Sequence, residues 1–208
     1  EVTVSTLEGK IIASGNPVDM LRSANAGPYQ FPIKAEFTNW RDEQEAWRNG
    51  AVLFDQSYHM TDHYIEGPDV KRLLEDLAIN SMANFRKDIA KQVVFCNYDG
   101  FVIGDAIMFI LDDNRVNIVN KPINRDWVQY HIETGDYDVE AVTDMRALDN
   151  NSRRMGYRFE VQGPNANAIL EKLNRGPLEG FKFFGMGTIN IDGVQVRALR
   201  HGMAGAVG

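Results

Sequence analysis

A strand, a Gly-Pro step and an amphipathic helix follow one another twice along this chain, and this repeated unit constrains the fold more than any other feature. The first copy passes through Gly67-Pro68 into a helix expected over 70–77, and the second passes through Gly163-Pro164 into a helix expected over 168–173. A unit of this kind buries one face of its helix against a sheet. The chain is therefore expected to contain at least two sheet-and-helix layers.

The Gly-Pro steps predict where the two helices begin. Proline suits the first helical turn, where its missing N–H is no loss, and Asp69 and Asn165 are expected to satisfy the free N–H groups there. The apolar residues of the first helix fall at i, i+3, i+4 and i+7 and form one stripe: Val70, Leu73, Leu74 and Leu77. This stripe is expected to pack on a sheet.

Turn signals predict antiparallel hairpins elsewhere. Asp99-Gly100 separates strands expected over 91–98 and 101–110, and the turn at 112–114 leads into a third strand over 115–119. The other expected elements are helices at 18–22, 43–49 and 124–133 and strands at 52–55, 63–66, 188–191 and 194–199. Hairpins mixed with packed helices predict an α+β fold built of antiparallel sheets with packed helices.

Composition excludes several classes of protein. The chain has 208 residues, of which 44% are hydrophobic and 25% charged, which is typical of a globular protein. Its formal net charge of -7 argues against a nucleic-acid surface, which needs a basic face, although a local basic pocket stays open. No apolar stretch approaches the roughly 20 residues of a membrane span, and no signal-like segment opens the chain. We expect a cytoplasmic protein without a membrane partner.

Cysteine and histidine usage argues against a metal site. Cys96 is the single cysteine and lies in the apolar run 93–96, so it is expected to be a buried thiol in a reducing compartment. The four histidines show no His-x-x-x-His or His-Glu-x-x-His spacing. His131 lies four residues after Trp127 on the predicted helix, which favours packing.

Five short motifs occur in a fixed order along the chain: Phe54-Asp55-x-Ser57-x-His59-Met60, Gly67-Pro68, Asp99-Gly100-x-x-x-x-Asp105, Gln162-Gly163-Pro164 and Arg200-x-Gly202. Each alone is a weak signal. In this order and spacing they resemble the folate-binding aminomethyltransferase family of the glycine-cleavage T-protein type, across nearly the whole chain.

Further segments are most similar to the tetrahydrofolate-dependent aryl O-demethylases of that family, which act on vanillate, syringate and 3-O-methylgallate: Asn39-Trp40-Arg41, Trp47-Arg48-Asn49, Val102-Ile103-Gly104-Asp105, Phe183-Phe184 and 199–205. The resemblance implies an enzyme that uses tetrahydrofolate as its cofactor. Its reaction would move a methyl group from a methoxy-substituted aromatic acid to N5 of tetrahydrofolate, without a metal.

The resemblance also implies a domain organisation. A folate-binding, T-protein-like region would span 1–208, with possible discontinuous lobes formed by 1–60 with 150–208 and by 61–149. Family members are longer than this chain, which opens on Glu1 and closes in a glycine-rich stretch. We therefore expect a fragment of a longer protein, whose remaining carboxy-terminal part is required for activity.

Asp105 is the expected catalytic and cofactor-binding carboxylate. In-line displacement at a methyl carbon needs two aligned molecules and stabilisation of the departing phenolate. The family places a carboxylate near the pterin, and Asp105 matches that position, where it would bind pterin N–H groups and favour a cationic N5. Without the resemblance, Asp105 is interpreted as a solvated residue at a strand end.

His59 and Tyr29 are the other expected catalytic residues, and both are expected to contact substrate. An imidazole titrates near neutral pH, so His59 can donate to the leaving oxygen; a structural role at a strand end is the alternative. The phenol of Tyr29 can hydrogen-bond the ether oxygen, or its ring can simply pack in a loop. Phe31 would give the substrate pocket an apolar wall.

Three further residues carry ligand-binding expectations. Lys121 stands where related demethylases have an arginine for the substrate carboxylate; lysine keeps the charge without the bidentate fork, and a solvated lysine before a helix is the alternative. Asn120 and Arg200 match positions that imply cofactor binding.

Two other functions stay open. One is a different folate-dependent aminomethyl or methyl transfer on the same scaffold, such as the glycine-cleavage step. The other is a non-catalytic folate-binding module. Modules of that kind carry a reactive cysteine in a Lys-Gly-Cys segment, which this sequence does not contain.

Overall fold

The computed structural model describes residues 6–22, 38–146, 153–178, 181–202 and 207–208. The chain divides into two compact units, Glu1–Gln30 and Phe31–Gly208, and each is described by itself. The first unit contains α1 (Leu7–Ser14) and α2 (Pro17–Arg22). Helix α2 was predicted from the sequence, whereas α1 was not. The start of α1 is fixed by Thr6, whose hydroxyl accepts a hydrogen bond from the N–H of Gly9 at 3.0 Å.

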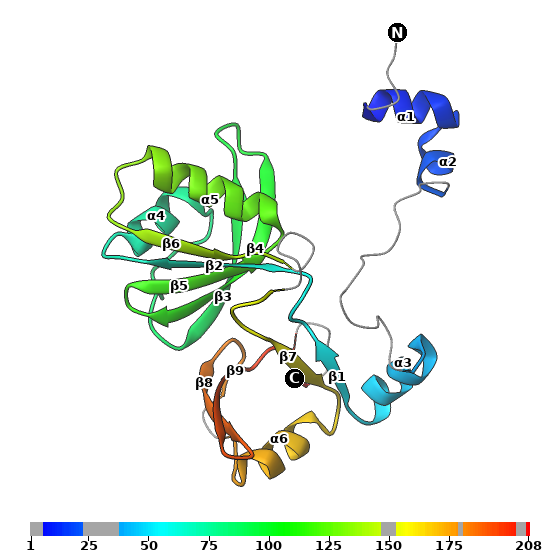
Figure 1. The fold of residues 1–208 in the computed structure, drawn as a ribbon, viewed down its shortest axis with the longest axis vertical. Helices are drawn as coiled ribbons and strands as arrows, with labels where there is room; N and C mark the ends of the chain where they lie inside the picture. Colours follow the sequence, from blue (N-terminus) through cyan, green and yellow to red (C-terminus); the bar gives the residue numbers. More distant parts are fainter. Residues whose placement is uncertain (1–5, 23–37, 147–152, 179–180, 203–206) are drawn as a thin grey trace. The chain divides into compact units, whose positions relative to one another are not determined.

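The described part of the second unit contains three antiparallel sheets (Figure 1). The largest has five strands in the order β3 (Ile89–Cys96), β4 (Val102–Asp112), β5 (Arg115–Asn120), β2 (Thr61–Glu66) and β6 (Glu140–Asp144). Two smaller sheets pair β1 (Val52–Asp55) with β7 (Phe159–Gln162), and β8 (Met186–Ile191) with β9 (Val194–Leu199). The helices are α3 (Trp40–Asn49), α4 (Val70–Leu77), α5 (Pro122–Thr134) and α6 (Ala166–Asn174). The α+β prediction and the meander β3-β4-β5 are confirmed.

One face of the five-stranded sheet is covered by α4 and α5, and the main core lies between them (Figure 1). The predicted stripe of α4 is buried as a whole: Val70, Leu73, Leu74 and Leu77. It meets Val93, Met108 and Ile118 of three neighbouring strands, while α5 contributes Val128. Fully burying each of these side chains stabilises the fold by roughly 1.5–3 kcal/mol. This core fixes the sheet whose opposite face carries the candidate site.

Both Gly-Pro steps have the same backbone geometry. Gly67 and Gly163 have φ of 151° and 131°, which favours glycine. A carbonyl approaches each glycine closely, from Asp138 and from Gly50 respectively. The same carbonyl accepts the N–H two residues further on, at 3.4 Å in the first copy and 2.9 Å in the second. The repeat seen in the sequence is thus a repeat of a backbone contact that only glycine permits.

The expected helix starts at these steps were wrong in two respects. Pro68 and Pro164 lie in turns before α4 and α6 rather than in the first helical turn. Neither Asp69 nor Asn165 makes a side-chain cap. The carboxylate of Asp69 instead accepts from Arg72 at 2.8 Å and from the N–H of Asp138 at 2.9 Å. The charged guanidinium of Arg72 is a stronger donor than a helix N–H, and it binds the carboxylate that was expected to cap α4.

Other element boundaries moved for local reasons. Helix α3 begins at Trp40, three residues before the predicted start, because the Asn39 side chain accepts from the N–H groups of Arg41 and Asp42. Strand β6 was not predicted, and it extends the sheet beyond β2. Gly50 ends α3 as expected.

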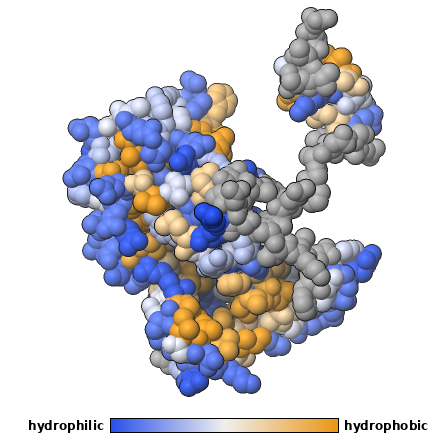
Figure 2. Space-filling view, viewed as in Figure 1, coloured by the Kyte–Doolittle hydropathy of each residue, from blue (hydrophilic) through white to orange (hydrophobic). Residues whose placement is uncertain are grey.

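Apolar side chains also reach the surface (Figure 2). Leu53 of β1 and Phe159 of β7 are 67% and 58% exposed. Strand register puts both on one face of the two-stranded sheet, since Leu53 pairs with Val161 and Asp55 pairs with Phe159. The residues that the structure describes leave this face largely uncovered.

Candidate functional site

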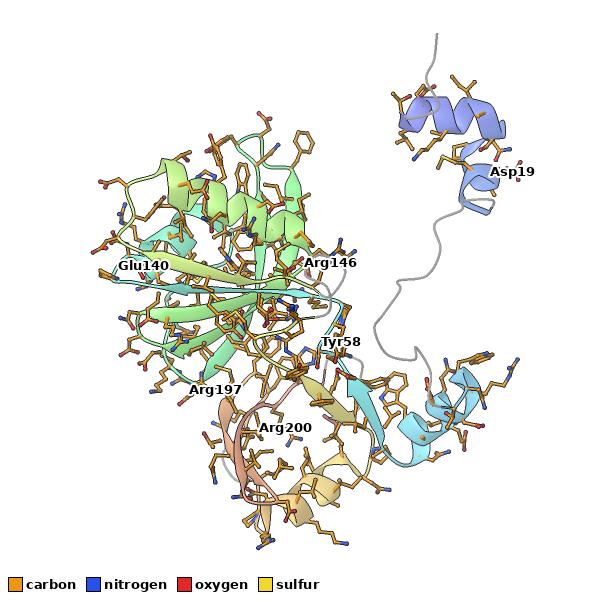
Figure 3. The ribbon with its side chains drawn as sticks, in the orientation of Figure 1. Asp19, Tyr58, Glu140, Arg146, Arg197 and Arg200 are labelled. Carbon is orange, nitrogen blue, oxygen red and sulfur yellow. The ribbon has the colours of Figure 1, made fainter. Side chains whose placement is uncertain are left out.

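Several of the predicted site residues meet at one end of the five-stranded sheet, which we call the site edge. Asn120 pairs with Thr61 and Asp144 pairs with Asp62, so the end of β5, the start of β2 and the end of β6 meet there. Ile107 pairs with Val119, which brings the start of β4, with Asp105, to the same end. Figure 3 labels Arg146 and Tyr58 at this end of the sheet and Glu140 at the other.

The side of the sheet away from α4 and α5, which we call the distal face, carries Asp105. Because side chains alternate along a strand, Asp105, Ile107 and Phe109 of β4 share this face with Gln92 of β3 and Asp62 of β2. Gln92 donates from Nε2 to Oδ2 of Asp105 at 2.9 Å. Asp105 is exposed, whereas Ile107 beside it is half-buried. The arrangement is an accessible carboxylate at the margin of an apolar surface.

The backbone of Asp105 is held from the other side of the sheet. Asn124 at the start of α5 is fully buried and donates from Nδ2 to the Asp105 carbonyl oxygen at 2.7 Å. Gly104 makes this possible, since a Cβ at that position would collide with the Asn124 side chain. The sequence Gly104-Asp105 therefore fixes the position of the carboxylate through its own backbone.

Asn120 and Lys121 are neighbours at the site edge with different surroundings. Strand alternation puts Asn120 on the helix-covered face, opposite to Asp105, and its Oδ1 accepts the N–H of Lys121. Lys121 follows the last paired residue of β5 at the site edge, is exposed, and precedes Pro122 at the start of α5 without capping the helix through its side chain. The structure thus places an exposed Lys121 at the site edge, whereas Asn120 lies on the face opposite to Asp105.

The His59 loop is shaped by its own motif. The carboxylate of Asp55 accepts the N–H of Ser57 at 2.9 Å. The buried Ser57 hydroxyl donates to the Arg158 carbonyl oxygen at 3.2 Å and accepts the Arg158 N–H at 3.0 Å. On the other side of His59, Arg154 donates from Nη1 to the carbonyl oxygen of Met60 at 2.7 Å. The spacing Asp-x-Ser-x-His therefore positions a histidine between two anchored backbone segments.

A buried ionic network lies beneath this loop. Arg154 forms ion pairs with Asp62 at 2.5 Å and with Asp144 at 3.4 Å. Asp62 also binds Arg158 at 2.5 Å and accepts from Nδ2 of Asn117 at 2.7 Å. The partners are distant in the sequence, so no local pattern indicated this network.

Burial and these two arginines lower the pKa of His59 below its ordinary value. Burial contributes most, followed by Arg158 and then Arg154. The imidazole is therefore neutral at pH 7 and can donate or accept one hydrogen bond without carrying charge.

The remaining histidines of β2 and α5 are structural. His63 is buried on the helix-covered face, where Nδ1 lies 3.0 Å from the Thr143 hydroxyl, and burial with Arg125 lowers its pKa to about 4. His131 packs against the Trp127 ring with centroids 4.6 Å apart, as the i, i+4 spacing indicated. Tyr98 packs edge-to-face with both rings.

The remaining predicted site residues are Tyr29, Phe31 and Arg200. Tyr29 and Phe31 lie outside the described residues. Arg200 directly follows β9 (Figure 3) and exchanges backbone hydrogen bonds with Phe184 and Gly185. Gly185 bridges to Ile89, at the end of β3 far from Val94, the partner of Asp105. Within the described segments no group of three or more His, Cys, Asp or Glu residues suits a metal ion, and no helix there is long and apolar enough to cross a membrane.

Residues 22–208 match the family described as the GCVT N-terminal domain. The chain is 45% identical over 205 residues to a syringate O-demethylase of Sphingobium sp. (strain NBRC 103272 / SYK-6), covering 98% of this chain and 44% of the relative. It is 29% identical over 180 residues to an aminomethyltransferase of Halothermothrix orenii, covering 85% and 47%.

The fold has a solved counterpart. The structure of the glycine cleavage system aminomethyltransferase T of Bartonella henselae superposes with a TM-score of 0.63 at 21% identity, over 80% of this chain and 43% of that one. The chain belongs to the GCVT N-terminal domain family. It spans less than half the length of these relatives.

Proposed function

We propose that the protein containing this chain is a tetrahydrofolate-dependent O-demethylase that transfers a methyl group from a methoxy-substituted aromatic acid, of the vanillate or syringate type, to N5 of tetrahydrofolate. The observation that carries this proposal is the 45% identity, over 98% of the chain, to a protein named syringate O-demethylase. The site edge adds an accessible carboxylate and a neutral histidine, which suit this chemistry.

The distal face fits a reduced pterin. Tetrahydrofolate, when bound, supplies a nucleophilic N5 that accepts the methyl group. The exposed Asp105 carboxylate can accept pterin N–H groups and favour the positive charge that develops during attack, and Gln92 holds that carboxylate in place. Half-buried Ile107 offers an apolar surface beside it for a flat ring.

Asn120 and Arg200 remain proposed cofactor contacts on the resemblance alone. In the described residues the Asn120 side chain serves the Lys121 N–H, and Arg200 lies away from the site edge. Asp105 is thus the cofactor contact with the most structural support.

His59 supports the departing phenolate. The ether oxygen gains negative charge as the methyl group leaves, and a neutral imidazole can donate one hydrogen bond to it. The nearby positive charges of Arg154 and Arg158, which hold the pKa of His59 down, also favour that developing negative charge. We further propose Tyr29, Phe31 and Lys121 as substrate contacts, with Lys121 at the site edge.

A second function is kept because a specific observation favours it. Several aminomethyltransferases match 28–32% of the residues in the aligned regions, so an aminomethyl transfer on the same scaffold remains the alternative. A non-catalytic folate-binding module is a weaker alternative. Modules of that kind carry a reactive cysteine in a Lys-Gly-Cys segment, whereas Cys96, the single cysteine here, lies in strand β3.

We place the reaction in the cytoplasm, in the breakdown of methoxylated aromatic acids such as those released from lignin. The lobes predicted at 1–60 with 150–208 and at 61–149 remain a proposal. So does the requirement for the carboxy-terminal part of the same protein, which would complete the site.

The test uses the full-length protein with tetrahydrofolate and, in separate reactions, vanillate, syringate, or a carrier protein whose lipoyl group already bears an aminomethyl group. Methyltetrahydrofolate and the matching phenol should form together from at least one aromatic acid. Asp105→Asn should lower kcat by about 100-fold or more, a typical loss for an electrostatic catalytic group. Asp113→Asn, in an exposed turn of the same hairpin, is the matched control. Turnover of the aminomethyl carrier, with no turnover of either aromatic acid, would replace the demethylase by the aminomethyltransferase.

A further inference from the structure

Arg158 lies across the middle of the distal face and is held there by two contacts. Its Nη2 binds Oδ1 of Asp62 at 2.5 Å, and its guanidinium carbon lies 5.6 Å from the centre of the Phe109 ring. The Asp62 carboxylate is itself fixed by Arg154 and Asn117. The guanidinium is therefore oriented before any ligand arrives, which lowers the cost of binding.

The side chain is nevertheless accessible. Arg158 is 31% exposed, whereas Arg154 is 2% exposed. The guanidinium of Arg154 donates hydrogen bonds to Asp62 and to the carbonyl oxygens of Met60 and Met145. Nη1 and Nε of Arg158 make no hydrogen bond with any residue in the described segments. Of the two arginines, only Arg158 can reach a ligand.

Arg158 is also tied to the loop that carries His59. Its carbonyl oxygen accepts the N–H of Gln56 at 2.9 Å and the hydroxyl of Ser57 at 3.2 Å. His59 follows two residues later. A ligand group bound to the free side of this guanidinium would thus lie close to the proposed leaving-group donor.

We propose that Arg158 is the residue that binds the carboxylate of the aromatic acid substrate beside His59. This assignment rests on the proposed function and adds a specificity residue to it. A guanidinium edge binds a planar carboxylate through two parallel N–H groups, which fixes direction as well as charge. Lys121, the residue expected for this task from the sequence, offers one mobile ammonium at the exposed end of β5. Its role becomes an auxiliary charge at the edge.

The charge on His59 provides an independent consequence. Arg158 is one of the two cations that lower the pKa of His59. A bound carboxylate offsets that charge, so the pKa of His59 rises when an aromatic acid binds. A neutral phenol in the same position carries no carboxylate, so it does not raise the pKa of His59.

A ligand carboxylate at this position has two sources, the aromatic acid and the glutamyl tail of the folate. Binding to the full-length protein separates them. The probes are syringate, its carboxylate-free analogue 2,6-dimethoxyphenol, tetrahydrofolate, and a tetrahydropterin without the glutamyl tail. Each is titrated into the wild type, Arg158→Gln and the control Arg115→Gln, which removes an exposed arginine at the opposite end of the sheet.

Arg158→Gln should weaken syringate binding by about 10- to 100-fold, the size expected for a charge-assisted pair, and leave 2,6-dimethoxyphenol within about twofold. Arg158→Lys should restore part of the affinity, and Arg115→Gln should change nothing. In the wild type, the NMR titration of His59 should move to a higher pKa with syringate, and in Arg158→Gln this rise should be smaller.

Three outcomes would overturn the proposal. Equal losses for syringate and 2,6-dimethoxyphenol would mean that Arg158 is structural. A loss confined to tetrahydrofolate, and absent for the tailless pterin, would assign the guanidinium to the folate tail. Unchanged syringate affinity would exclude Arg158, with Lys121→Gln then tested as the anchor. If syringate binding depends on Arg158 but syringate is not demethylated, the proposed function is wrong, while the assignment of Arg158 as the carboxylate-binding residue still holds.

Discussion

Arg154 donates from Nη2 to Oδ2 of Asp62 across 2.5 Å, and the two side chains are 2% and 4% exposed. The second buried carboxylate, Asp144, lies 3.4 Å from Nε of the same guanidinium. One arginine thus pairs with two carboxylates and also binds backbone carbonyl oxygens at the end of the His59 loop and just after β6. The network joins the segment 153–158 to the distal face.

Removing this guanidinium should strongly destabilise the fold. Arg154→Met leaves Asp62 and Asp144 buried with less compensation, and breaking a buried ion pair costs about 3–5 kcal/mol. Urea unfolding followed by fluorescence measures the free energy of unfolding. The matched control is Arg175→Met, which breaks an ion pair with Asp192 whose side chains are 77% and 83% exposed, and should change stability by about 1 kcal/mol or less. Similar losses in both variants would contradict a special role for Arg154.

The second Gly-Pro step provides a test of backbone crowding. A Cβ on Gly163 would lie 2.6 Å from the Gly50 carbonyl oxygen and 2.9 Å from Cα of Ala51. Gly163→Ala should therefore cost more than about 2 kcal/mol, because a steric clash adds to an unfavourable φ. Gly193 also has a positive φ, 94°, but a Cβ added there would have no atom within 4 Å. Gly193→Ala should therefore show only the conformational cost, about 1 kcal/mol. Equal thermal shifts in the two variants would rule out the clash.

The buried His63 should make the fold less stable in mild acid. Its pKa is lowered to about 4 by burial and by Arg125, against 6.5 for an exposed histidine, while Asp126 acts in the opposite direction. As pH falls from 6.5 toward 4, the unfolded chain takes up a proton that the folded state refuses, so stability drops by up to about 3 kcal/mol.

His63→Gln should flatten this part of the pH profile of unfolding, since glutamine keeps a hydrogen-bonding group near Thr143 without titrating. The midpoint of urea unfolding, measured from pH 7.5 to pH 4.5 in both proteins, reports the difference. An NMR titration of His63 with a midpoint near 6.5 would refute the explanation.

The sequence specified local elements well because their signals are local. Gly67-Pro68 and Asp99-Gly100 each determine a turn from a few neighbouring residues, and the α4 stripe needs only helical periodicity. Strand β6 was missed because its stability comes from pairing with β2, which no local pattern records. The Asp69 cap failed because Arg72 and the N–H of Asp138, which lies far along the chain, took the carboxylate.

The candidate site shows the same division. His59 and Asp105 stand in short motifs whose geometry the structure explains through Ser57 and through Asn124. The Asp62–Arg154 pair joins residues 92 positions apart, so neither partner stands out in the sequence. Asn120 and Asp105 lie on opposite faces of the sheet, and only the pairing register of β4, β5 and β2 reveals this.

Gly104 should matter for folate binding because of what lies behind it. A methyl group at this position would collide with the Asn124 side chain, which holds the Asp105 carbonyl oxygen at 2.7 Å. Gly104→Ala and Asn124→Ala should each displace Asp105 and, on the proposed function, weaken tetrahydrofolate binding to the full-length protein by about tenfold, the size of one lost charge-assisted contact. Titration calorimetry measures the affinity, and the double variant should be no worse than either single one, because both changes act through the same hydrogen bond. Additive losses would show that the two residues act separately, and unchanged affinity in all three would remove Asp105 from the folate site.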